Sequence, residues 1–317
     1  MCVSKPKIIA VVGPTSSGKT ALGVYLARKL GGSSRAKPRG EIISADSRQV
    51  YRGLNIGTGK ATLREQAGIP HHLLDVASPK KQFSANEFLY LGTKALKKIM
   101  IYHKLPIIVG GTGLYVDALL GRMSVAEAPP DEKLRRRLEK KSVSELFSML
   151  KKKDPARAKT IEPEHKRRLV RALEIATAIG RSPSLSDGAV QKFHRGDASM
   201  KFDVLWLGIA VPEPELKRRI RARLRARLRR GMVAEGRRLH AQGLSYKRME
   251  ELGLEYRALA KHLRGDIGRA EMTEKLERDI WKYAKRQMRW FKRNSDIRWV
   301  KNKTESLRLA KKFLGGR

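Results

Sequence analysis

The sequence has little of what disulfide-bonded, metal-clustered or membrane-spanning proteins need. Its 317 residues include one cysteine, Cys2, which excludes an internal disulfide and any Cys-x-x-Cys metal site. The longest apolar runs, around Ile8–Val12 and Pro106–Val109, are far too short to cross a bilayer, and no signal-peptide pattern opens the chain. We therefore expect a protein of the reducing cytoplasm that has no membrane segment.

Acidic residues are scarce beside basic ones. The chain has 31 Asp plus Glu against 70 Lys plus Arg, so its formal net charge is +39. A charge of this size indicates a polyanionic partner, most simply a nucleic acid, although part of it can be ordinary solvated surface. The length is enough for a large core and suggests about two domains.

Residues 7–20 carry the clearest chemical motif. An apolar, β-branched run at 8–12 predicts a buried parallel strand, and helix-forming residues follow the motif. Between them the sequence matches G-x-x-x-x-G-K-[ST], whose loop N–H groups, lysine and following helix hold phosphates, and whose last hydroxyl ligates Mg²⁺. We predict a phosphate site, with Thr20 as its metal ligand, at Gly13, Pro14, Thr15, Ser16, Ser17, Gly18, Lys19 and Thr20. The loop leaves open whether the phosphates belong to ATP or to another molecule.

Two more strand–loop–helix patterns follow. A short apolar strand at 41–45 ends at Asp46, and another at 105–109 ends in a glycine-rich turn at 110–113. Residues 71–79 read as irregular. Three such patterns predict a P-loop NTPase-like α/β fold, a parallel sheet flanked by helices, in which Asp46 lies at the edge where ligands bind.

The predicted domain order has three parts. Residues 1–128 form the first part of the α/β core, and residues 129–200 are charged, helical and poor in apolar residues, as expected of an inserted, mainly helical domain. Residues 201–317 return to the sheet near 203–211 and end in helices.

The segment 213–240 alternates arginine with apolar residues, which also fits a strand. We predict one helix instead, because the run is long and Arg, Leu and Ala are strong helix formers. On that helix the apolar residues form a stripe spaced by four, and Arg219, Arg223 and Arg227 form a parallel row.

Motifs along nearly the whole chain, in the same order, resemble the bacterial-type tRNA dimethylallyltransferases, also called tRNA isopentenyltransferases or the IPP transferase family. The matching stretches are GPTSSGKT (13–20), DSRQVYRGLNIGTGK (46–60), PHHLLD (70–75), FSANEF (83–88), VGGTGLY (109–115), RRLVRALE (167–174), GLEYR (253–257) and AKRQMRWFKR (284–293). Arg289 and Ala61 depart from the threonine and proline usual in the family.

The resemblance implies a transfer reaction. The dimethylallyl group of dimethylallyl diphosphate would pass to N6 of adenosine 37 in the tRNA anticodon loop, and diphosphate would be released. In this family the P-loop holds the diphosphate of the donor rather than ATP. The implied partners are the tRNA anticodon stem-loop and dimethylallyl diphosphate, the cofactor is Mg²⁺, and a monomer is the simplest expectation.

The resemblance also assigns roles to individual residues. Asp46 would be the general base, Arg223 would bind the diphosphate from the second half of the chain, and Thr112 would meet the target nucleotide. Asp46 could instead cap a helix or support Mg²⁺. Arg219 or Arg227 would replace Arg223 if the register shifted by a turn.

An adenine stacked in an anticodon loop must be flipped out to reach such a site. Asp46, Ser47, Arg48, Gln49 and Thr112 would then read it. The remaining residues that match tRNA-contacting positions or add basic charge are Arg135, Arg167, Arg168, Leu169, Val170, Arg171, Lys285, Arg286 and Arg293. For any single basic residue, a solvated surface position is an equally good interpretation.

Three other functions fit part of the sequence. A P-loop kinase of a small molecule explains the loop but not the charge of +39. An adenylate isopentenyltransferase needs the same donor site but no large basic module. An NTP-dependent nucleic-acid-binding module needs no general base, so it predicts that Asp46→Asn leaves function intact.

Overall fold

The computed structural model describes residues 5–30, 40–126, 128, 131–180 and 202–315 of the chain. The chain divides into two compact units. One joins Met1–Leu120 with Met200–Arg317 and holds the sheet, and the other spans Gly121–Ser199 and is helical. We call them the α/β unit and the helical unit. Among the described helices of both units, each is too short or too polar to span a bilayer.

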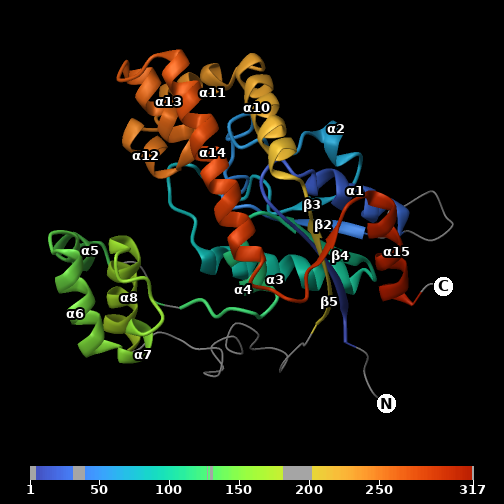
Figure 1. The fold of residues 1–317 in the computed structure, drawn as a ribbon, viewed down its shortest axis with the longest axis horizontal. Helices are drawn as coiled ribbons and strands as arrows, with labels where there is room; N and C mark the ends of the chain where they lie inside the picture. The colour runs from blue at the N-terminus through green and yellow to red at the C-terminus, as the bar shows by residue number, and fades with distance from the viewer. Residues whose placement is uncertain (1–4, 31–39, 127, 129–130, 181–201, 316–317) are drawn as a thin grey trace. The chain divides into compact units, whose positions relative to one another are not determined.

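Six parallel strands form the sheet of the α/β unit, in the order β3-β2-β4-β1-β5-β6 (Figure 1). The strands are β1 (Lys7–Val12), β2 (Gly40–Ala45), β3 (His71–His72), β4 (Leu105–Gly110), β5 (Asp203–Ile209) and β6 (Arg298–Val300). This confirms the predicted fold class, including the return of the chain to the sheet near residue 203. The prediction of an irregular 71–79 was wrong at its start, because His71 and His72 pair with Ile42 and Ile43. A strand of two residues is too short to leave a period in the sequence.

Helices connect and cover the strands. They are α1 (Lys19–Lys29), α2 (Leu63–Gln66), α3 (Ala85–Ile101), α4 (Gly113–Leu119), α10 (Glu213–Arg229), α11 (Met232–Ala241), α12 (Tyr246–Glu251), α13 (Leu254–Arg264), α14 (Arg269–Phe291) and α15 (Lys303–Leu314). In Figure 1, α1 and α15 lie on one face of the sheet, and α3 and α4 lie on the other. The helix α3 begins at a capping box in which Ser84 and Glu87 bond each other's backbone.

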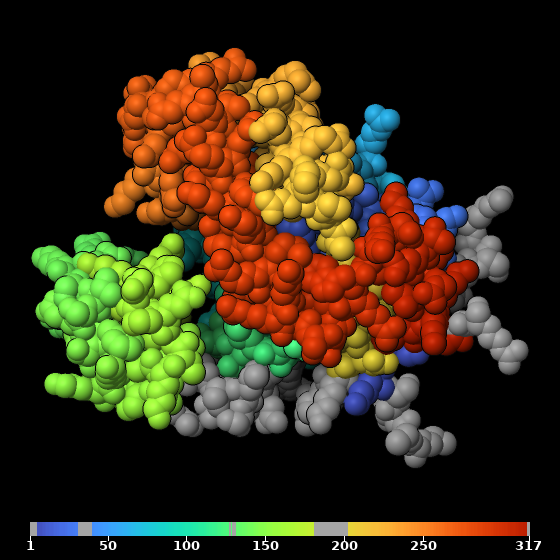
Figure 2. All heavy atoms as spheres, in the orientation of Figure 1, coloured from blue at the N-terminus to red at the C-terminus, as the bar shows by residue number. Residues whose placement is uncertain are grey.

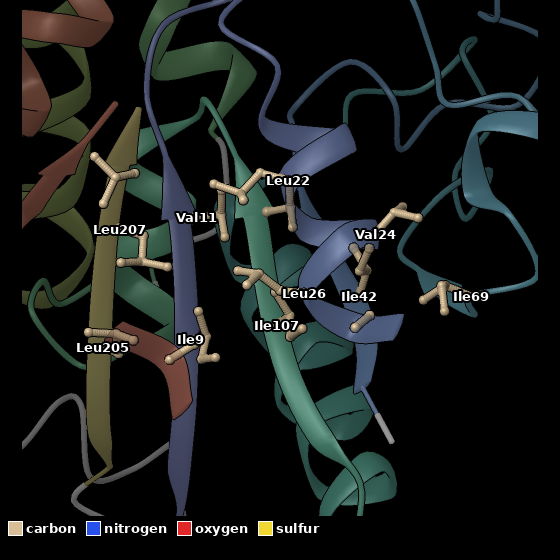
Figure 3. Packing of buried hydrophobic residues seen from close by; sticks show 14 residues of the cluster. Ile9, Val11, Leu22, Val24, Leu26, Ile42, Ile69, Ile107, Leu205 and Leu207 are labelled. Carbon is tan, nitrogen blue, oxygen red and sulfur yellow. The ribbon is translucent and has the colours of Figure 1, made fainter. Parts of the chain in front are cut away.

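The packing of α1 fixes the loop in front of it. Leu22 and Leu26 are buried against β-branched side chains of the sheet such as Ile9 and Ile107 (Figure 3). The helix lies so close that a Cβ on Gly23 would come within 2.5 Å of a methyl of Val109. Burying these side chains stabilises the unit and holds the start of α1 at the carboxyl edge of the sheet.

The arginine-rich segment is helical, but it is two helices rather than one. The helix α10 ends at Arg229, and Gly231 adopts φ 95° before α11 begins at Met232. Glycine takes this left-handed conformation without the Cβ clash that other residues pay, so it ends the first helix. In Figure 2 the atoms of α10, in yellow, lie directly against those of α14, in orange. The apolar stripe of α10 is buried.

The helical unit has its own small core and a buried charge. Its helices are α5 (Glu132–Glu139), α6 (Val143–Lys153), α7 (Pro155–Ala158) and α8 (Lys166–Ile179). Leucines from α5, α6 and α8 make the core. Beside it, Glu174 is 1% exposed and binds Arg135 at 2.9 Å, Arg171 at 2.5 Å and the N–H of Asp131 at 2.6 Å. Burial alone would raise the pKa of Glu174, but the hydrogen bonds from Arg171 and Arg135 outweigh it and leave that pKa lowered.

Candidate functional site: a polar cavity at the edge of the sheet

A cavity of about 410 Å³ opens at the carboxyl ends of β1, β2 and β4. The P-loop, the end of β2, the loop before α2, and the helices α10 and α14 line it. Of the residues predicted from the sequence, those on its wall are Thr15, Ser16, Gly18, Lys19, Thr20, Asp46, Gln49 and Arg223. The structure therefore brings the anion loop, the predicted base and an arginine from the second half of the chain to one place.

The P-loop presents an uncapped helix start to this cavity. Gly18 has φ 95° and stands at the N-cap of α1, where no side chain bonds the first N–H groups. Lys19 donates from Nζ to the carbonyl of Pro14 at 2.6 Å. Burial, followed by the charge of Arg223, lowers the pKa of Lys19 to about 7. Backbone donors and a lysine in electropositive surroundings favour an anion here.

Arg223 is the member of the arginine row that faces the cavity without a carboxylate partner among the described residues. Its Nη2 donates to the carbonyl of Gly59 at 2.9 Å. A Cβ on Gly59 would lie 2.4 Å from that nitrogen, so the close approach needs a glycine. Burial, followed by the charge of Arg227, lowers the pKa of Arg223. Such a guanidinium is suited to hold a diphosphate.

The two alternative arginines are each paired with a carboxylate. Arg227 is 6% exposed, donates to the carbonyl of Gly57 at 2.5 Å and pairs with Glu255 at 3.0 Å. Arg219 reaches the cavity wall but is exposed and pairs with Glu215 at 2.7 Å. Position 223 is therefore the one that the geometry favours.

The two carboxylate oxygens of Asp46 differ: one accepts hydrogen bonds within a local turn, and the other accepts none among the described residues. Its Oδ1 accepts the N–H of Arg48 at 2.8 Å and that of Gln49 at 3.3 Å. These bonds close a turn rather than cap a helix, because no helix begins in the described segment between β2 and α2. Its Oδ2 makes no hydrogen bond within the described residues. The turn fixes the carboxylate at the cavity and leaves an oxygen to accept a proton, so the two roles are compatible.

Thr112 stands beside this turn rather than on the cavity wall. Its Oγ1 accepts the N–H of Ser47 at 3.0 Å, and its own N–H donates to the carbonyl of Ala45 at 3.2 Å. Beside it lies Tyr283, a partly buried tyrosine of α14 whose pKa is raised by burial and then by Asp46. Thr112 thereby joins the end of β4 to the segment that carries Asp46.

Two residues of α14 that reach the cavity were not predicted as site residues, although one of them lies in the motif at 284–293. Tyr283 and Gln287 lie four residues apart and both line it. The signal was a polar residue on the buried side of a charged helix, at the spacing of one turn. The sequence analysis also missed Glu235, whose carboxylate accepts the N–H groups of Asn55, Ile56 and Gly57 at 2.7–3.0 Å and holds the loop that carries Gly59.

Beyond the segment 46–49 and Thr112, the residues predicted to contact RNA fall into three groups. Lys285, Arg286 and Arg293 are exposed in the α/β unit, and Arg167 and Arg168 are exposed in the helical unit. Arg135 and Arg171 are partly exposed and bound to Glu174. Leu169 and Val170 are 0% and 4% exposed, and their side chains belong to the core of the helical unit. The prediction that these side chains contact RNA was therefore wrong.

The oxygen atoms on the cavity wall show whether this site could hold the predicted Mg²⁺. Among the described residues no three His, Cys, Asp or Glu side chains gather where they could hold a metal by themselves. Thr20 and the carboxylate of Asp46 are on the wall, and Mg²⁺ in phosphate sites is commonly held by one or two protein oxygens together with phosphate oxygens. The residues present therefore fit an ion that arrives with a phosphate ligand.

Residues 49–294 match a family model described as IPP transferase. The chain is 40% identical over 311 residues to tRNA dimethylallyltransferase 1 of Geotalea uraniireducens, covering 97% of this chain and 96% of the relative. It is 36% identical over 301 residues to the tRNA dimethylallyltransferase of Pelotomaculum thermopropionicum, covering 94% and 91%.

Solved structures agree with the sequence relatives. The full-length tRNA isopentenylpyrophosphate transferase of Bacillus halodurans superposes with a TM-score of 0.69 at 32% identity, covering 98% of this chain and 96% of that one. A eukaryotic dimethylallyltransferase described as acting on tRNA superposes with a TM-score of 0.71 at 28% identity, covering 90% and 70%.

Proposed function

The chain belongs to the IPP transferase family, and we propose that it transfers the dimethylallyl group of dimethylallyl diphosphate to N6 of an adenosine beside the tRNA anticodon. The single observation that carries this proposal is the meeting of an anion loop, Arg223 and Asp46 in one cavity. That combination provides two positive groups for a leaving diphosphate and a carboxylate for a proton.

The proposed reaction is a single substitution at C1 of the dimethylallyl group. The N6 nitrogen of adenine forms a bond to C1 of the dimethylallyl group while the C1–O bond to diphosphate breaks. The electron pair of that bond leaves with the diphosphate oxygen, where Lys19 and Arg223 stabilise the charge. The N6 proton passes to Oδ2 of Asp46, which its bonds to Arg48 and Gln49 hold in place.

Mg²⁺ is part of the proposal. Thr20 would hold it together with oxygens of the diphosphate, and the ion would neutralise part of the diphosphate charge when bound. The residues of the chain do the rest of the binding through the loop N–H groups, Lys19 and Arg223.

Two features support RNA as the substrate: the exposed basic residues and the cavity, which a flipped-out adenine could enter. The adenine must leave the stack of the anticodon loop to reach Asp46, and Gln49 on the cavity wall offers an amide to its edge. The exposed arginines and lysines of both units supply phosphate contacts, so RNA affinity should fall steeply as salt rises. We propose that a monomer binds one tRNA, and that the reaction takes place in the cytoplasm, where tRNA is the substrate.

Nucleoside mass spectrometry tests this function. Unmodified tRNA is incubated with the enzyme, Mg²⁺ and dimethylallyl diphosphate, and its nucleosides are then measured. We expect a five-carbon increment on one adenosine beside the anticodon. The same increment on free AMP but not on tRNA would favour an adenylate isopentenyltransferase. ATP consumption with neither product would favour a small-molecule kinase.

A further inference from the structure

The side chain of Gln287 joins the long helix α14 to both loops that flank the cavity. It is 5% exposed and lies on the cavity wall. Its Oε1 accepts the N–H of Thr15, in the anion loop, at 2.7 Å. Its Nε2 donates to the carbonyl of Gly111, in the turn after β4, at 2.9 Å. One amide therefore bridges the phosphate site to the turn that precedes Thr112.

The chemistry of the two contacts requires an amide. One neighbour offers an N–H and the other a carbonyl, so the side chain must accept on one side and donate on the other. A carboxylate would turn lone pairs towards the carbonyl of Gly111 and would repel a diphosphate. An apolar side chain would leave both backbone groups unpaired, which is unfavourable for groups that are shielded from water.

The turn opposite is shaped to receive this amide. A Cβ on Gly111 would lie 2.2 Å from Nε2 of Gln287. A side chain at position 111 would therefore displace the amide, whereas its distance to Nζ of Lys19 would be an ordinary 3.6 Å. One turn earlier on α14, Tyr283 also lies on the cavity wall. The helix thus lines the cavity at two residues one turn apart, and Gln287 is the one that bonds the turn after β4.

We propose that Gln287 is a positioning residue that holds the anion loop in its diphosphate-binding shape through the N–H of Thr15. The inference rests on the proposed function, because it takes the ligand of the loop to be a diphosphate. It predicts that loss of the bridge weakens binding of the donor rather than binding of the RNA, because neither hydrogen bond of the amide reaches the exposed face of α14.

Two variants break the bridge from opposite sides. Gln287→Met keeps the volume but removes both hydrogen bonds, and Gly111→Ala displaces the amide without changing α14. Met272→Leu is the matched control, because Met272 is a fully buried residue near the start of the same helix. For each full-length protein, calorimetry gives the Kd of pyrophosphate with Mg²⁺, anisotropy gives the Kd of an anticodon stem-loop, and thermal unfolding gives Tm.

We expect the Kd of pyrophosphate to rise about tenfold or more in both test variants, because each variant loses one or two of the hydrogen bonds that hold the loop. The Kd of the stem-loop should stay within about twofold, and the KM for the donor should rise more than kcat falls. The Met272→Leu protein should match the wild type in both affinities.

Three results would overturn the inference. One is a pyrophosphate Kd in both variants within about twofold of the wild type. Another is a parallel loss of pyrophosphate affinity, stem-loop affinity and Tm, which is the pattern of a merely structural residue. The third is a wild-type protein that binds no pyrophosphate, which would contradict the proposed function as well. If Gln287→Met does not fold, Gly111→Ala still decides between these outcomes.

Discussion

The cavity of the α/β unit and the core of the helical unit treat their charged side chains in opposite ways. In the helical unit, the carboxylate of Glu174 is surrounded by Arg135, Arg171 and a backbone N–H. In the α/β unit, Lys19 and Arg223 line a cavity, and among the described residues both donate only to backbone carbonyls. Burial and then the charge of Arg223 lower the pKa of Lys19. Burial and then the charge of Arg227 lower the pKa of Arg223, so each of the two cations is repelled by a neighbouring cation.

The difference separates a charge that stabilises a fold from charges that bind a ligand. A buried ion that is fully paired contributes to the stability of its surroundings, and removing one partner is costly. Buried cations that lack a counter-ion destabilise the empty site and are satisfied when an anion enters. We therefore expect substitutions in the helical unit to lower stability and substitutions at the cavity to lower binding or chemistry.

The largest expected effect follows from Asp46→Asn. The amide keeps the size of the side chain but cannot take the N6 proton, so the transfer rate should fall about a thousandfold. The Kd values of pyrophosphate and of the anticodon stem-loop should stay within a few-fold, since Asp46 provides none of the positive charge. Single-turnover transfer and the two Kd values check this, and an Asp46→Asn protein with wild-type transfer would remove Asp46 from the mechanism.

Next in size is the effect of Glu174→Ala in the helical unit. Loss of the carboxylate leaves two arginines and the N–H of Asp131 without their partner, so amides of α8 should lose about 3 kcal/mol of protection against hydrogen exchange. Glu162→Gln is the control, because its pair with Arg168 is exposed and should contribute less than about 1 kcal/mol. Equal protection in the two variants would contradict a structural role for Glu174.

The arginines of α10 allow the comparison within one helix. Arg223→Met should weaken pyrophosphate binding about a hundredfold at nearly unchanged Tm, because Arg223 has no carboxylate partner. Arg227→Met, one turn later, should instead lower Tm, because it leaves Glu255 without its partner. Calorimetry and thermal unfolding of the pair check this, and exchanged phenotypes would show that the diphosphate lies nearer Arg227.

The smallest expected effect, taken over one pH unit, is the pH dependence of anion binding. The pKa of Lys19 in the free protein is lowered to about 7, so above that pH the lysine must take up a proton before it can pair with an anion. Pyrophosphate affinity should therefore fall as pH rises from 7 to 9, by up to about tenfold per pH unit. Lys19→Met should bind weakly with no such dependence. A wild-type affinity that is level across this range would contradict the low pKa.

The sequence predicts most of the fold and of the cavity, for local reasons. The P-loop, Asp46 and the parallel sheet follow from motifs and apolar runs that the structure confirms. The break at Gly231 was missed because a glycine inside a run of helix formers does not show its φ in the sequence. The bridge by Gln287 was missed because Thr15 lies far away in the chain, and only the packing of α14 brings them together.

The most direct test of the account is a comparison of ligands at the cavity. Calorimetry of the wild-type protein with Mg²⁺ should give a Kd for dimethylallyl diphosphate at least tenfold below that for ATP, with Arg223→Met weakening the first by about a hundredfold. ATP bound as tightly as dimethylallyl diphosphate, or an Arg223→Met protein with unchanged donor affinity, would contradict the claim that these unpaired cations form the site of an isoprenoid diphosphate.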